Sequence, residues 1–139
     1  VVLTPMDGLT VVAGTGEKVN GTQMDDISTM GFTYTYGPVS AGYQVSEIDL
    51  AAANSGQAGD SETTYVGLAF NVNENLSLSY GEQETEIDGQ SLDQELEGFS
   101  IGYSMGGISL KAHSNEGTGM GGTANNSSEH TEISVSFAF

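Results

Sequence analysis

The chain is 139 residues long, contains no cysteine, and carries 19 acidic but only 2 basic residues, which gives a formal net charge of −17 at pH 7. The absence of cysteine excludes disulfide bonds and thiolate metal centres. The scarcity of lysine and arginine argues against a nucleic acid partner, because phosphate binding requires basic side chains. The length suits one domain, and no stretch approaches the roughly 18 consecutive apolar residues of a transmembrane helix.

Apolar residues alternate with small or polar ones along most of the chain, which predicts β-strands with two different faces. Residues 1–3 are interpreted as the last part of a strand, and residues 5–8 as a turn. Eight strands are predicted after it: residues 9–18, 28–36, 39–48, 63–72, 76–83, 97–105, 108–113 and 130–139. The faces of the first of these eight cannot be assigned from its pattern.

The predicted connections alternate strictly between short and long. Residues 37–38, 73–75 and 106–107 are short turns, the last of them a Gly-Gly hairpin turn. Residues 19–27, 49–62, 84–96 and 114–129 are expected to be long polar loops. Short turns at one end of the strands and long loops at the other are typical of outer-membrane β-barrels.

The closing strand has one apolar face and ends in an aromatic residue. Its apolar residues are Ile133, Val135, Phe137 and Phe139, separated by Ser134, Ser136 and Ala138. This ending resembles the C-terminal signature of bacterial outer-membrane β-barrels. The resemblance implies that Ile133, Val135, Phe137 and Phe139 form an assembly signal, which the barrel-assembly machinery reads during biogenesis.

Further segments resemble the C-terminal half of Gram-negative general porins of the alphaproteobacterial kind. They are residues 31–43 (GFTYTYGPVSAGY), 75–81 (NLSLSYG) and 98–113 (GFSIGYSMGGISLKAH), followed by residues 129–139. The resemblance implies an all-β, antiparallel, up-and-down transmembrane barrel of 16 strands, of which residues 1–139 supply about eight as a single domain without the N-terminal strands. It also implies a homotrimer in the outer membrane, in contact with the lipid bilayer and lipopolysaccharide. The constriction residues of that family lie mainly in the N-terminal half, so none can be assigned here.

A porin is a passive channel and not an enzyme, and it passes small hydrophilic solutes and ions. Strand parity predicts an inward face of small and polar residues, too small to fill a narrow eight-stranded barrel and suited to the wall of a wide channel. The predicted pore-lining residues are Thr33, Thr35, Gln44, Asn71, Ser79, Ser100, Ser109, Lys111, His113, Glu132 and Ser134. Carboxylates and uncharged groups are expected to outnumber Lys111 on this face, which favours cations. Lys111 either tunes ion flow or pairs with Glu132 on the adjacent strand.

No cofactor is expected apart from structural Ca²⁺ in the external loops. Asp25 with Asp26, or Asp60 with Glu62, could hold Ca²⁺ at the base of a predicted loop, because carboxylate oxygens are the ligands that Ca²⁺ prefers. His113 and His130 flank one loop and could meet at the barrel rim. Without a carboxylate at helical spacing, however, the two histidines make a poor metal motif.

A second class of function remains open on the sequence alone. The same strands could form a soluble extracellular β-sandwich, such as an adhesin or surface-layer module with acidic calcium-binding loops. In that fold the apolar faces would pack against a second sheet of the protein instead of lipid.

Overall fold

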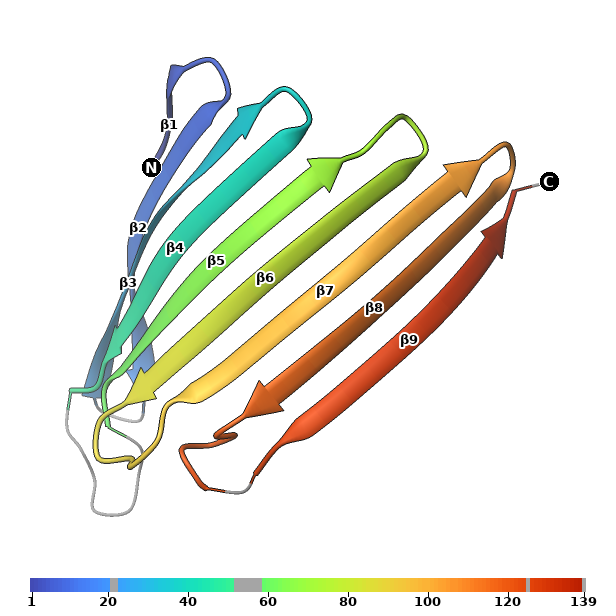
Figure 1. The fold of residues 1–139 in the computed structure, drawn as a ribbon. Helices are drawn as coiled ribbons and strands as arrows, with labels where there is room; N and C mark the ends of the chain where they lie inside the picture. Colours follow the sequence, from blue (N-terminus) through green and yellow to red (C-terminus); the bar gives the residue numbers. More distant parts are fainter. Residues whose placement is uncertain (21–22, 52–58, 125, 139) are drawn as a thin grey trace.

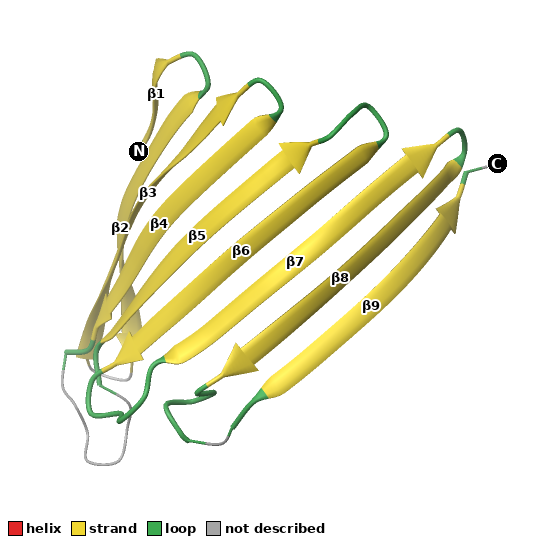
Figure 2. Ribbon diagram, viewed as in Figure 1, coloured by secondary structure: helices red, strands yellow, loops and turns green. Residues whose placement is uncertain are grey.

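The computed structural model describes residues 1–20, 23–51, 59–124 and 126–138. They form one antiparallel sheet of nine strands, in which each strand pairs with its neighbours in sequence (Figure 1). The strands are β1 (Val2–Met6), β2 (Leu9–Asn20), β3 (Gln23–Tyr36), β4 (Val39–Asp49), β5 (Ser61–Asn71), β6 (Leu76–Ile87), β7 (Gln94–Met105), β8 (Ile108–Thr118) and β9 (Ser128–Phe137). Figure 2 shows strands joined by loops in a single layer. No helix in the described ranges is long and apolar enough to cross a membrane.

The all-β, antiparallel, up-and-down architecture is confirmed, with nine strands in place of eight. The additional strand is β1, which pairs with β2 through a two-residue turn at Asp7 and Gly8. The sequence prediction ended this strand too early because it read Pro5 as part of the turn. β1 is an edge strand, where a proline need not donate a hydrogen bond to a neighbour. β9 forms the other edge, and the sheet is not closed.

The predicted segregation of connections is also present, although the long loops are shorter than expected. The predicted loop 19–27 is wrong, because β2 and β3 remain paired as far as Asn20 and Gln23. β6, β7 and β8 likewise extend into segments that were expected to be loops, which leaves connections at 50–60, 88–93 and 119–127. β9 ends at Phe137, at the end of the sheet that carries the short turns (Figure 1).

The two faces of the sheet differ in both exposure and chemistry. Along β6 and β7, residues alternate between half-buried and exposed, and the half-buried set includes Ser79, Gly81, Gly98 and Ser100. Crowding of one face indicates that the sheet curves toward it, so we call that face concave and the opposite face convex. Most of the exposed large apolar side chains on the strands lie on the convex face, and among the described residues no hydrophobic side chain is buried.

Candidate functional site

The concave face is a polar wall. The register places all eleven predicted pore-lining residues on it, since their cross-strand partners are also small or polar, for example Ser79 opposite Ser100 and Lys111 opposite Ser134. Hydroxyl groups bond across neighbouring strands on this face, for example Ser79 to Ser100 at 2.7 Å and Thr29 to Ser46 at 2.8 Å. Such cross-strand pairs stabilise a sheet without an apolar core on that side. Their role in lining a pore remains a prediction.

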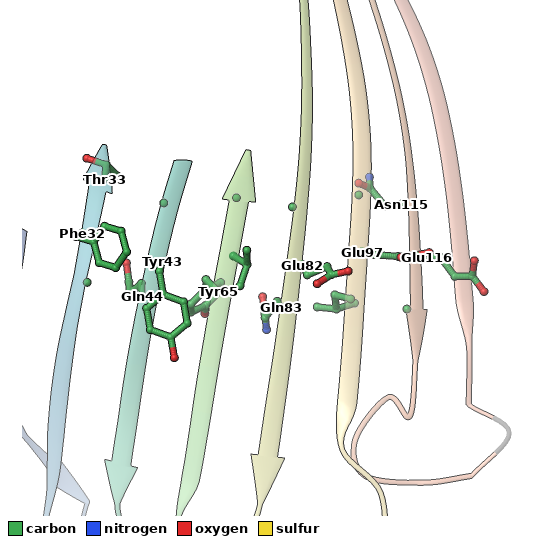
Figure 3. A pocket seen from close by; sticks show the side chains of 18 of the residues that line it. Phe32, Thr33, Tyr43, Gln44, Tyr65, Glu82, Gln83, Glu97, Asn115 and Glu116 are labelled. Carbon is green, nitrogen blue, oxygen red and sulfur yellow. The ribbon is translucent and has the colours of Figure 1, made fainter. Parts of the chain in front are cut away.

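A row of glycines runs across the middle of the concave face. Gly42, Gly67, Gly81 and Gly98 are successive cross-strand partners on β4, β5, β6 and β7. The hollow above this row has a volume of about 660 Å³. Figure 3 shows Gln44, Tyr65 and Gln83, which lie in the adjacent cross-strand row of this face, along the hollow.

The convex face carries an apolar band next to the short turns. On β7 the band consists of Phe99, Ile101, Tyr103 and Met105, and equivalent residues continue it on the neighbouring strands. On β9 the predicted assembly-signal residues Ile133, Val135 and Phe137 belong to the band. Phe139, the fourth predicted residue of the signal, lies outside the described residues.

Beyond the apolar band, toward the long loops, the same convex face carries a belt of carboxylates. The register assigns to this belt Glu17, Asp26, Glu47, Asp49, Glu62, Glu82, Glu84, Glu86, Glu95, Glu97, Glu116 and Glu129. Tyr80 stands at the boundary, where its hydroxyl donates to Glu82 and to Glu97. Sequence reasoning missed the belt because it treated residues 84–96 as a loop. The signal was available, because Glu82, Glu84 and Glu86 have the same parity as Leu76, Leu78 and Tyr80.

The belt leaves few carboxylates on the inward face, where uncharged residues still outnumber the lysines. On the strands, the concave face carries two carboxylates, Asp25 and Glu132, against the two lysines Lys18 and Lys111. Asp25 is 4% exposed and lies opposite Lys18. The register puts His113, and not Lys111, directly opposite Glu132.

The four residues predicted to hold Ca²⁺ do not share one face. Asp25 lies on the concave face, whereas Asp26 and Glu62 lie on the convex face. Two of the carboxylates accept backbone N–H groups near the loop that follows β4: Asp25 from Ala51 at 3.3 Å and Asp60 from Leu50 at 2.8 Å. Calcium binding by these residues remains a prediction.

Two other groups of side chains bring three possible metal-ligating atoms close together within the described part of the chain. One consists of Glu84, Glu86 and Asp93, and the other of His113, His130 and Glu132. The predicted approach of the two histidines is confirmed, since their ring centroids are 6.0 Å apart.

No protein-family model, curated protein or solved structure matches the chain. The fold and the two faces thus define the chain as an all-β protein built on one curved up-and-down sheet.

Proposed function

We propose that this sheet is part of the wall of an outer-membrane β-barrel of the general porin kind, which forms a water-filled channel for passive diffusion of small hydrophilic solutes and ions. The observation that carries the proposal is the direction in which the sheet curves, since its polar face is on the concave side. Its convex face carries a broad apolar band next to the short turns, and its concave face is mostly polar and rich in glycine and serine. A water-filled membrane barrel needs this arrangement, with lipid outside and water inside.

The alternative, a soluble β-sandwich, requires a different arrangement. Its two sheets would bury their apolar faces against each other. Here the described residues form a single sheet, and apolar side chains such as Ile133, at 69% exposure, are not covered by the chain. The single sheet therefore gives no support to the β-sandwich interpretation.

The stagger of the strands also supports a barrel. β2 begins at Leu9, and β8 begins at Ile108. The cross-strand row that contains Leu9 reaches β8 at Ser114, which is six residues beyond Ile108. Six residues at about 3.3 Å each, across six strand spacings of about 4.8 Å, correspond to a strand tilt of about 35°. Strands in membrane barrels tilt by roughly 35–45°. The apolar band follows the same stagger, since Phe32 on β3 shares a row with Glu97 on β7.

In this proposal the short turns and the C-terminus face the periplasm, and the carboxylate belt and long loops face the cell exterior. The remaining strands of the barrel come from outside these 139 residues. The lipid bilayer, lipopolysaccharide and further copies of the chain in a trimer are the proposed partners, together with the barrel-assembly machinery during biogenesis.

Site-directed spin labelling tests the proposal directly, because the chain has no native cysteine to remove. Single substitutions Ser109→Cys and Leu110→Cys place labels on opposite faces of β8 in the full-length protein reconstituted into lipid vesicles. We expect the label at 110 to be accessible to dissolved oxygen but not to a water-soluble paramagnetic chelate, and the label at 109 to show the reverse. A label at 110 shielded from both reagents would indicate a protein core and would support the β-sandwich instead.

A further inference from the structure

Two histidines and a glutamate meet on the concave face of the last hairpin. His113 on β8 lies directly opposite Glu132 on β9, and His130 precedes Glu132 by two residues on the same face. One potential ligand atom from each of the three side chains lies within 4.8 Å of the others. Sequence spacing alone gives little sign of this group, because His113 and Glu132 are brought together by strand pairing.

The distances within this group are too long for hydrogen bonds but suit atoms that share a metal ion. The Nε2 atoms of His113 and His130 each lie 3.7 Å from the same carboxylate oxygen, Oε2 of Glu132. Hydrogen bonds between nitrogen and oxygen normally span about 2.7–3.2 Å. Two ligands that each bind a tetrahedral ion at about 2.0–2.1 Å are about 3.3 Å apart. A shift of a few tenths of an ångström would therefore bring each of these pairs to coordination distance.

The chemistry of the donors selects a class of ion. Imidazole nitrogens suit Zn²⁺, Cu²⁺ and Ni²⁺, whereas Ca²⁺ and Mg²⁺ prefer sites made only of oxygen. Two histidines and one carboxylate form a known zinc ligand set that leaves a fourth position for water. The side chains of His113, His130 and Glu132 are 35%, 64% and 54% exposed, so an ion and its water have access.

Strand pairing fixes the backbone positions from which the three side chains extend. β8 and β9 are paired from Ile108 and Phe137 to Gly117 and Ser128, so the group lies within a continuous hydrogen-bonded ladder. Lys111 is the charged neighbour on this face of β8, and it lies two residues from His113 opposite Ser134. Its positive charge opposes a bound cation without occupying the site.

We propose that His113, His130 and Glu132 form a binding site for one divalent transition-metal ion, with Zn²⁺ as the best fit. The site is built by one hairpin and does not depend on closure of the sheet or on the membrane. In a channel, the bound ion would add two positive charges to the wall on the loop side of Lys111.

Titration calorimetry of the full-length protein with Zn²⁺ tests the site, and Co²⁺ provides a visible absorption spectrum that reports coordination by imidazole. We expect about one Zn²⁺ per chain. His113→Ala and His130→Ala should each weaken binding by more than about tenfold, since even the loss of groups that only support metal ligands costs 10–100-fold. Glu132→Gln should also weaken binding, and Lys111→Ala should strengthen it.

The double variant Glu84→Gln with Glu86→Gln is the matched control, because it removes two carboxylates from the other group of ligand atoms and leaves the histidines intact. It should bind Zn²⁺ as the wild type does. His130 is exposed, so His130→Ala should leave the protein folded, and lost binding would then reflect a lost ligand. The circular dichroism spectrum of the β-sheet checks that the variant is folded. Absence of stoichiometric binding to the wild type, or equal binding by His130→Ala, would overturn the proposal. Neither result bears on the porin proposal, which the spin-label experiment tests separately.

Discussion

At the scale of single residues, the concave face contains glycines of two kinds. At Gly31 an added Cβ would lie 2.6 Å from the backbone oxygen of Tyr43 and 2.9 Å from Cα of Gln44. At Gly67 an added Cβ would meet nothing within 4 Å. Gly31 is therefore required by close contact with β4, whereas Gly67 leaves open space above the glycine row.

This difference predicts opposite effects of the same substitution. Gly31→Ala should destabilise the protein by roughly 1–3 kcal/mol, because a methyl group has to be forced against a neighbouring backbone. Gly67→Ala should be neutral or stabilise by up to about 1 kcal/mol, because alanine restricts the unfolded chain more than glycine does. Urea unfolding of both variants in the same detergent measures the difference. Equal destabilisation by the two substitutions would contradict the predicted close contact at Gly31.

At the scale of elements, β9 combines an exposed apolar side with an edge of the sheet. Ile133, Val135 and Phe137 are 69%, 53% and 59% exposed on the convex face. A strand with this side at the border of a sheet invites pairing with another strand. In the proposed barrel, lipid covers the apolar side and a strand from outside this sequence pairs with the edge.

If the end of β9 is an assembly signal, a charge at its terminal aromatic residue should block insertion. We expect Phe139→Asp to abolish outer-membrane insertion while synthesis continues, because the substitution removes the terminal aromatic residue of the predicted assembly signal. Ser136→Asp, on the concave face of the same strand, is the control and should insert. Fractionation of membranes followed by immunoblotting measures both. Normal insertion of Phe139→Asp would show that the end of the closing strand is not an assembly signal.

At the scale of the whole molecule, the charges are separated by face and by end. The concave wall carries equal numbers of lysines and carboxylates on its strands, while the belt on the convex face supplies most of the negative charge. A pore mouth surrounded by charge of one sign concentrates counter-ions. We therefore propose that cation preference arises at the rim, from the belt and the loops, and not along the wall.

This origin predicts a strong dependence of selectivity on salt. Cation preference should be clear at 0.01 M KCl and nearly absent at 1 M, because the Debye length falls from about 30 Å to about 3 Å. Lys111→Glu should increase cation preference modestly, and Lys111→Gln should give an intermediate value. Because Lys111 acts locally on the wall, its effect should persist at higher salt than that of the rim. Reversal potentials in planar bilayers measure these quantities, and an anion-selective wild-type channel would contradict a rim-controlled preference.

The sequence by itself determined eight of the nine strands, the two faces of most of them and the ends at which short and long connections lie. Alternation of side chains is a local property, so the apolar positions on β7 and β9 could be read directly from it. The limits of the strands could not, because the polar stretches near Asp25 and Glu84 resemble loops until a neighbouring strand pairs with them.

Only the tertiary structure decided the curvature, the stagger and the contacts between strands distant in sequence. Alternation shows that Leu110 and Ser109 lie on different faces, but it does not show which face is convex. The register brings His113 to Glu132 and aligns Glu82 with Glu97, and register depends on the pairing of whole strands, which no local pattern specifies. For that reason the proposed metal site, and the alignment of carboxylates across neighbouring strands, became visible only when the nine strands were assembled into one sheet.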